Sequence, residues 1–269
     1  MTTALECGAG HGPGQVRPTG HLWLEPALVS IAGPRPDNQD AGTAGPSLIA
    51  VADGVGGNVG GAIASTVVVE AVRTAMYDDS GPSSDRLSRA VESANEQLGR
   101  AIAANPGLAG MATTLTAVAL EQGCLTIAHV GDTRAYVLRN GLLCRLTRDQ
   151  TVVQSLVDAG LVDEAHLCTH PMRSVLLGAL HGRADDAQHL DVTTVPVFAG
   201  DRILVCSDGL TGVVGPDLIE RVLREEARPE AAATRLVKDA LAAATHDNVT
   251  VVVADVAKSG SLSAGPPSS

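Results

Sequence analysis

The segment RAYVLRNGLLCRL (residues 134–146) contains the clearest local folding signal of this chain. Two runs of β-prone residues flank the dipeptide Asn140-Gly141. A type I′ turn needs positive φ angles at both of its central positions, and Asn and Gly adopt such angles with little strain. The segment therefore predicts a β-hairpin.

Further strands are predicted on both sides of this hairpin. MATTLTAVALEQ (111–122) and CLTIAHVGD (124–132) meet at a turn formed by Gln122-Gly123, which extends the hairpin into an antiparallel meander. The apolar runs SLIAVAD, DRILVCSD and NVTVVVADV have the length of strands and are nearly unbroken. Such runs are typical of sheets that are covered on both faces.

Helical spacing of apolar residues occurs between the predicted strands. Residues 87–102 follow a three-and-four pattern, with Ser83, Ser84 and Asp85 available as caps, and residues 236–244 repeat the pattern. Another helix is predicted to start at Pro216. Antiparallel hairpins with helices grouped between them favour a layered α+β fold over an alternating, doubly wound one.

The composition limits the classes of function. The chain has 269 residues, 45% of them hydrophobic, which predicts one large globular domain. Aromatic residues make up only 1%, so base stacking and aromatic cages are disfavoured. A net charge of -11 disfavours binding to nucleic acid.

The ends of the chain and its cysteines bear on domain limits and location. Residues 1–21 and 258–269 are rich in small and turn-forming residues, so we expect flexible tails around one domain at 22–257. The start MTTALECGAG has neither the cationic nor the apolar segment of a signal peptide, so we expect none, and no apolar run is long enough to span a membrane. The cysteines are odd in number and form no CxxC pair, which favours free thiols and a cytoplasmic location. They are Cys7, Cys124, Cys144, Cys168 and Cys206.

Aspartates stand at the ends of four predicted strands, and a fifth lies in the loop RPDNQD. A single Asp-Gly pair after a strand is most often only a turn. Strand ends in a compact sheet often share an edge, however, so we expect the set to meet in one cleft. Carboxylates that lie so close together cannot all stay ionised without compensation, so either the pKa of one of them rises or a cation binds. The set consists of Asp40, Asp53, Asp132, Asp208 and Asp247.

This ligand set predicts a hard divalent cation. Oxygen ligands without His or Cys at metal-ligand spacing select magnesium or manganese, and the carbonyl of Gly54 is a further candidate ligand. Two carboxylate-bridged cations would lower the pKa of a shared water and hold a phosphoryl group for in-line attack. Arg35 is either the planar fork that binds the phosphate or a solvated loop arginine.

Eight segments between residues 35 and 256 resemble, in chain order, the metal-dependent serine/threonine protein phosphatases of type 2C, and their bacterial members in particular. The segments are RPDNQD, VADGVGG, GMATTLTAVAL, HVGDTRAYVLRNG, LTRDQT, THPMRSVLLGAL, ILVCSDGL and DNVTVVVADV. The resemblance implies a four-layer α-β-β-α sandwich of two antiparallel sheets flanked by helices. It also implies a phosphoric monoester hydrolase that removes phosphate from phosphoserine or phosphothreonine by direct attack of a metal-bridging water.

The resemblance also implies roles for the residues of the cleft. Asp53 would bridge two core ions, Mn²⁺ or Mg²⁺, with the Gly54 carbonyl, Asp208 and Asp247 completing the ligand shell. Asp40 would act close by, partly through water.

Three further parts of the chain take roles from the same resemblance. Asp132 would help to hold a third, weaker ion, and Arg35 would bind the substrate phosphate. Residues 154–187 would form a flap beside the site, with Thr169-His170-Pro171 introducing a short helix. The expected partners are phosphorylated proteins and a Ser/Thr protein kinase that the enzyme opposes, with no nucleic acid, no membrane, and a monomeric chain.

Two positions depart from the family pattern. Gln39 stands where many relatives have glutamate, which affects a water-mediated contact. Val55 stands where some relatives have a histidine proposed as general acid, so protonation of the leaving group would fall to a metal-bound water.

Several alternatives compete with the phosphatase interpretation. The run DGVGGNVGGAIAS does not match GxGxxG of dinucleotide-binding folds, and Ser207 lacks the first glycine of a nucleophile elbow. His129 is expected in the core, and His246 either supports Asp247 or is a plain loop residue. The remaining alternative is a pseudophosphatase that binds phosphoproteins without turnover; such a protein usually lacks a ligand, and none is missing here.

Overall fold

Two antiparallel sheets form the centre of the structure, a computed structural model that describes residues 21–56, 59–76 and 81–259. One sheet has the order β1-β12-β11-β8-β9, the other β10-β7-β6-β3-β2, and β4 pairs with β5. The strands are β1 (Leu22–Ile31), β2 (Ala41–Ala44), β3 (Leu48–Ala52), β4 (Gly54–Val55), β5 (Ala112–Thr113), β6 (Leu115–Glu121), β7 (Cys124–Val130), β8 (Arg134–Arg139), β9 (Leu142–Arg145), β10 (Asp191–Pro196), β11 (Arg202–Cys206) and β12 (Val249–Lys258).

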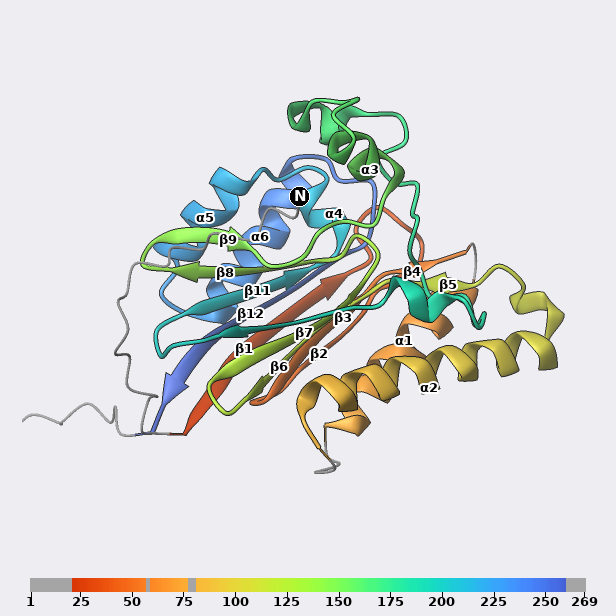
Figure 1. Ribbon diagram of the computed structural model, residues 1–269. Helices are drawn as coiled ribbons and strands as arrows, with labels where there is room; N and C mark the ends of the chain where they lie inside the picture. The colour runs from red at the N-terminus through yellow and green to blue at the C-terminus, as the bar shows by residue number, and fades with distance from the viewer. Residues whose placement is uncertain (1–20, 57–58, 77–80, 260–269) are drawn as a thin grey trace, which may run out of the picture.

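Helices cover the outer face of each sheet (Figure 1). α1 and α2 pack on the sheet that contains β3 and β6, while α5 and α6 pack on the sheet that contains β11 and β12. The expected four-layer α-β-β-α sandwich is therefore confirmed. The helices are α1 (Val59–Ala75), α2 (Ser83–Ala104), α3 (Val152–Asp158), α4 (Asp208–Thr211), α5 (Pro216–Glu225) and α6 (Pro229–Ala242), with 3-10 turns η1 (Pro106–Leu108), η2 (Glu164–Thr169) and η3 (Asp186–His189).

The unbroken apolar strands are explained by burial on both faces. In β3, Ile49 and Val51 enter the core between the two sheets, whereas Leu48, Ala50 and Ala52 face α1 and α2. Successive side chains of a strand point to opposite faces, so a strand between two packed layers has no exposed side. The scarcity of aromatic residues follows, since these cores are filled by Ala, Val, Leu and Ile.

The predicted turns are confirmed by their backbone angles. Asn140 and Gly141 have φ of 52° and 80° between β8 and β9, and Gln122 and Gly123 have φ of 50° and 78° between β6 and β7. Both pairs occupy the left-handed region that tight hairpins of this type require.

The predicted helices are present as α2, α5 and α6, but the cap assigned to α2 is wrong. Its N-cap is Pro82, which makes no side-chain cap bond. Ser83 is buried instead, and its hydroxyl pairs with the hydroxyl of Thr126 at 2.7 Å. A tertiary contact to β7 thus outcompetes the local cap.

The first and last strands bound the sandwich in the described part of the chain. β1 begins at Leu22, and β12 ends at Lys258, one residue beyond the predicted limit. Both predicted tails fall almost wholly outside the described residues. Among those residues, no helix combines the length and apolarity that crossing a bilayer demands. Cys124 and Cys206 are free thiols, whereas Cys144 is disulfide-bonded, which corrects the expectation of free thiols at that residue.

Candidate active site

A cleft of about 820 Å³ lies at one edge of the sandwich. The predicted residues Asp53, Asp132, Asp208 and Asp247 all line it. Asp53 follows β3, Asp132 follows β7, Asp208 follows β11, and Asp247 precedes β12, so both sheets contribute strand ends to the same edge. Segments that are far apart in the sequence thus bring four carboxylates to one cavity.

Tight backbone packing fixes the positions of these aspartates. The amide of Asp53 donates to Thr114 Oγ1 at 3.0 Å, and the Asp53 carbonyl accepts from the Thr114 amide at 2.9 Å. A Cβ at Gly209 would overlap the carbonyl oxygen of Asn248, so only glycine lets the chain turn after Asp208. Gly54, whose carbonyl is the candidate ligand, lines the cleft.

The fifth aspartate, Asp40, adjoins the cleft through a hydrogen bond that the sequence did not predict. Ser207 Oγ donates to Asp40 Oδ2 at 2.7 Å, and the amide of Thr250 donates to the same Ser207 hydroxyl oxygen at 3.0 Å. Ser207 is fully buried, which excludes it as an exposed nucleophile. Its role is to orient Asp40.

Asn248 is the other supporting residue that sequence reasoning missed. Its side chain accepts from the amide of Gln39 at 2.8 Å and donates to the carbonyls of Ala32 and Asp37 at 2.8 and 2.9 Å. These bonds fasten the loop that carries Arg35 and Asp40 to the start of β12. The sequence signal that could have identified Asn248 is its place in the segment DNVTVVVADV, next to Asp247.

The aspartates of the cleft are buried without full compensation. Asp40 Oδ1 and Asp208 Oδ1 are inaccessible to solvent and have no hydrogen-bond partner in the described part of the chain. Burial, reinforced by neighbouring carboxylates, raises the pKa of Asp40 to about 6 despite its bond from Ser207. Burial and neighbouring carboxylates likewise raise the pKa values of Asp53, Asp132 and Asp208. Orphaned carboxylate oxygens of this kind fit a hard divalent cation.

The carboxylates nevertheless do not close around a single point. Within residues 21–56, 59–76 and 81–259, no three acidic, imidazole or thiolate side chains surround one point closely enough to form a metal cage by themselves. Carboxylates repel one another when no cation lies between them, and backbone carbonyls and water complete most sites for such cations. The arrangement fits a site in which side chains supply only part of the ligands.

Arg35 lies at the rim of the cleft and contacts one of the aspartates. Its Nη2 lies 2.9 Å from Asp247 Oδ2, and its Nε donates to the carbonyl of His246 at 2.8 Å. The Arg35 side chain is 53% exposed. Arg173, which sequence reasoning missed, also lines the cleft.

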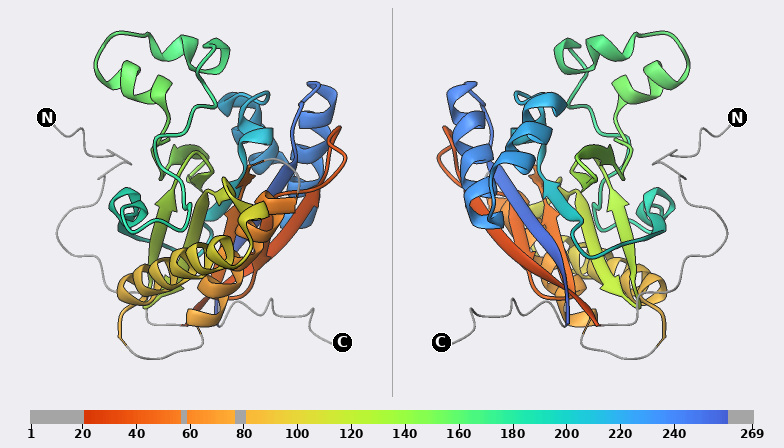
Figure 2. Two further views of the ribbon diagram at one scale, coloured as in Figure 1. Left: turned by 90° about the vertical axis from the view of Figure 1, so that its right-hand side faces the viewer. Right: turned by 90° about the vertical axis from the view of Figure 1, so that its left-hand side faces the viewer.

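Figure 2 shows most of the predicted flap, residues 154–187, in green at the top of the molecule, beyond the ends of the strands. Ser174, Val175 and Leu176 line the cavity. The expectation that Thr169-His170-Pro171 introduces a short helix is wrong, because η2 ends at Thr169. The proline stands after that turn, where it cannot continue a helix.

The predictions for the remaining singled-out residues have different outcomes. His129 is 2% exposed and bonded to Thr116 Oγ1 and the Arg148 carbonyl, so its assignment to the core is confirmed. His246 lines the cleft, and Val55 lines it with 41% exposure. The side chain at position 55 of the cleft therefore has no group that could donate a proton.

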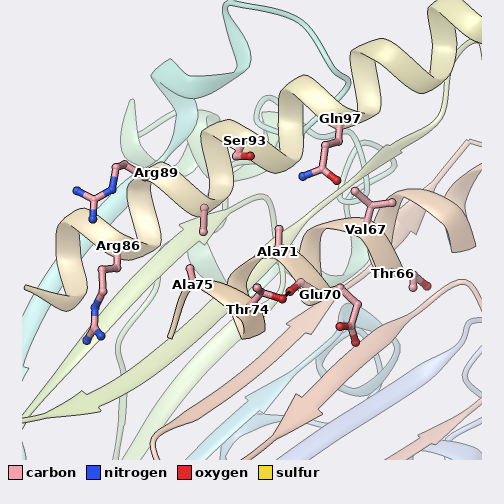
Figure 3. Close-up of a pocket in the computed structure, with 11 residues that line it drawn as sticks. Thr66, Val67, Glu70, Ala71, Thr74, Ala75, Arg86, Arg89, Ser93 and Gln97 are labelled. Atoms are coloured by element: carbon pink, nitrogen blue, oxygen red, sulfur yellow. Dashed lines mark hydrogen bonds between the residues drawn. The ribbon is translucent and has the colours of Figure 1, made fainter. Parts of the chain in front are cut away.

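A second hollow, of about 550 Å³, lies between α1 and α2 (Figure 3). Among its described lining residues the only carboxylate is Glu70, which pairs with Arg73 at 2.6 Å. Because its charges are paired and no acidic cluster faces it, this hollow lacks the chemistry of the acidic cleft.

Comparisons with known proteins agree with this geometry. A family model described as protein phosphatase 2C matches residues 35–246. The chain is 42% identical over 229 residues to the serine/threonine protein phosphatase PstP of Mycobacterium tuberculosis, covering 82% of this chain and 43% of that protein. It therefore spans less than half the length of that relative. It is also 30% identical to a serine/threonine phosphatase of Listeria monocytogenes, covering 77% of this chain and 84% of that protein.

A solved structure extends the comparison to three dimensions. The catalytic domain of PstP, crystallised in complex with two manganese ions, superposes with a TM-score of 0.82 at 37% identity. The match covers 88% of this chain and 100% of the other.

Proposed function

The chain belongs to the protein phosphatase 2C family, and on that premise we propose that it is a metal-dependent hydrolase of phosphoserine and phosphothreonine in proteins. One observation carries the proposal. Four aspartates from both sheets line one cleft, and the buried oxygens Asp40 Oδ1 and Asp208 Oδ1 lack partners among the described residues. Such a cleft is tolerated most readily when cations fill it.

Two cations would be held by Asp53, Asp208, Asp247 and the Gly54 carbonyl. Asp40 would lie beside them, and Asp132 would help to hold a third cation. Manganese is supported by the complex of PstP with two manganese ions, and magnesium prefers the same oxygen ligands. When bound, the ions would polarise the phosphoryl group and lower the pKa of water.

Arg35 would bind the substrate phosphate. In the structure its guanidinium spans Asp247 and the His246 carbonyl at the cleft rim, where it faces the carboxylate that would ligate a cation. A planar fork in this position can engage two phosphate oxygens, and pairing with Asp247 holds it ready.

The domain limits and partners complete the proposal. Residues 22–257 would form the catalytic domain, with 154–187 as the flap. The substrates would be phosphorylated proteins, and the natural counterpart would be a Ser/Thr protein kinase.

Hydrolysis in the presence and absence of metal tests this function. The purified chain should hydrolyse p-nitrophenyl phosphate and a phosphothreonine peptide with manganese, and chelator should abolish both activities. Asp208→Asn should lower kcat/KM by at least about 100-fold because a ligand is lost. Asp85→Asn, on the exposed start of α2, is the matched control and should retain activity. A pseudophosphatase would show no turnover in any arm, and activity that survives chelation would contradict the metal-dependent account.

A further inference from the structure

A row of three residues crosses the floor of the cleft. Val55 of β4 lies opposite Ala112 of β5 in an antiparallel pair. On the other side of β5, Thr113 and Leu180 exchange two backbone hydrogen bonds of 3.0 and 2.9 Å. Continuing this register by one residue places His181 beside Ala112.

The three side chains of this row share one face. Residues opposite one another on neighbouring strands project to the same side of a sheet, and Val55, Ala112 and His181 all line the cleft. Strands lie about 4.8 Å apart, so the backbones of Val55 and His181 are about 10 Å apart. Ala112 contributes only a methyl group between them. The imidazole of His181 therefore has room to extend over Ala112 toward Val55. The side chain of Val55 cannot itself donate a proton.

The imidazole of His181 is anchored by one of its two nitrogens. Nδ1 lies 3.0 Å from the carbonyl oxygen of Ala179 and 3.5 Å from Asp186 Oδ1. A carbonyl oxygen can only accept, so Nδ1 carries a proton. Nε2 has no partner among the described residues, and the side chain is 44% exposed.

A rigid support holds this anchor in place. Asp186 is buried, and its Oδ2 accepts from the amides of His181 and Arg183 at 2.6 and 2.9 Å. Asn95 of α2 accepts from the Gly182 amide at 2.8 Å and donates to the Arg183 carbonyl at 2.7 Å. The imidazole is thus fixed from its own loop and from the helical layer behind it.

We propose that His181 is a catalytic residue whose Nε2–H protonates the departing serine or threonine oxygen, an inference that rests on the proposed phosphatase activity. The bond between phosphorus and the side-chain oxygen breaks, its electron pair goes to that oxygen, and the proton moves from Nε2 to the same atom. Water supplies the new phosphate oxygen and releases one proton to solvent, and solvent then returns a proton to Nε2. In the imidazolium form, Nδ1–H keeps the Ala179 carbonyl and faces Asp186.

The charged groups around His181 define what else could titrate in a pH profile. Asp186 and the backbone of Arg183 lie beside the ring. The other charged residues that line the cleft are Arg35, Asp37, Asp53, Asp132, Arg173, Asp208 and Asp247.

The decisive comparison uses two leaving groups. p-Nitrophenolate leaves as a stable anion, whereas a threonine alkoxide requires a proton. His181→Asn keeps an amide N–H that can reach the Ala179 carbonyl but lacks Nε2. We expect kcat on a phosphothreonine peptide to fall by about 100-fold, kcat on p-nitrophenyl phosphate to change by less than about threefold, and KM to stay nearly constant. His166→Asn, on η2 outside the cleft, should alter neither substrate.

Two further measurements separate a proton donor from a structural histidine. Introducing Val55→His into the His181→Asn enzyme should restore part of the peptide activity, because both positions lie in one row. Nitrogen NMR of the wild-type enzyme should show a proton on Nδ1, an observation that does not depend on the folding of any variant.

The outcomes distinguish this inference from the proposed function. Wild-type protein that hydrolyses neither substrate with manganese overturns both. Wild-type activity combined with equal losses on the two substrates, or with no loss on either, overturns the role of His181 alone. An Nε2 that is protonated while Nδ1 is bare also overturns it.

Discussion

Two groups of aspartates in this molecule differ in how their charge is compensated. Asp149 and Asp201 are both paired with arginine. Among the described residues, the aspartates of the cleft have no such arginine partners apart from the exposed pair of Asp247 with Arg35. The comparison teaches that burial alone does not mark a functional carboxylate, whereas burial without a counter-charge does.

The compensated group shows how complete the satisfaction can be. Asp149 accepts from Arg134 Nε and Nη2, the latter at 2.6 Å, and also contacts Arg145 Nη2. Asp201 accepts from Arg139 Nε and Nη2 at 3.0 and 2.7 Å. These carboxylates serve the fold, and no cation is needed to explain them.

The strongest test of this comparison applies the same substitution to both groups. Asp149→Asn leaves Arg134 and Arg145 side by side without their shared carboxylate, which should cost about 3–5 kcal/mol of unfolding free energy. Asp208→Asn removes a charge that has no partner, so stability in chelator should be retained or raised. Urea denaturation at pH 8 measures both. Equal losses of stability would erase the distinction between the two groups.

The stability of the metal-free protein should depend on pH through the uncompensated aspartates of the cleft, and Asp40 shows the expected direction. In the folded protein the pKa of Asp40 is about 6, whereas the ordinary pKa of the same carboxyl is 3.8. Between these two pH values the folded chain keeps a proton that the unfolded chain has released. The folded state then binds more protons, so stability falls as pH rises from about 4 to about 7, by at most ~3 kcal/mol for this group.

The contribution of Asp40 can be isolated by difference. Denaturation midpoints of wild type and Asp40→Asn in chelator should diverge with rising pH, the wild type losing more. Saturating manganese should remove this divergence, because binding of a cation requires the ionised carboxylate. Parallel pH profiles in chelator would show that Asp40 is compensated after all.

The smallest expected effect comes from an exposed ion pair, which serves as the baseline. Arg100 and Glu96 on α2 lie 3.4 Å apart and are 70% and 74% exposed. Arg100→Ala should change the unfolding free energy by no more than about 0.5 kcal/mol, because solvent screens the pair. A loss comparable with that of Asp149→Asn would mean that the assay does not resolve buried from exposed charge.

Much of the fold could be predicted from local signals. Asn140-Gly141 and Gln122-Gly123 specify hairpins through their positive φ angles, and the strands between packed layers are recognisable from unbroken apolar runs. The cap of α2 could not be predicted, since Ser83 bonds to Thr126, a residue that only the folded chain brings near.

The candidate site shows the same division. The aspartates were identifiable from their places at strand ends, and both sheets do bring them to one edge. Ser207, Asn248 and His181 were not assigned their supporting or chemical roles, because each acts through contacts that only the folded chain makes, with partners up to 216 residues away. Pattern and spacing do not encode such pairings.

The amino-acid sequence by itself determined where strands, turns and helices occur, because backbone preferences and the alternation of apolar residues act over a few neighbours. It also determined which acidic residues end those strands. Only the tertiary structure decided which buried carboxylates receive an arginine and which are left uncompensated, and that His181 shares a row with Val55. Electrostatic compensation depends on distances between side chains, and those distances exist only once the two sheets have packed.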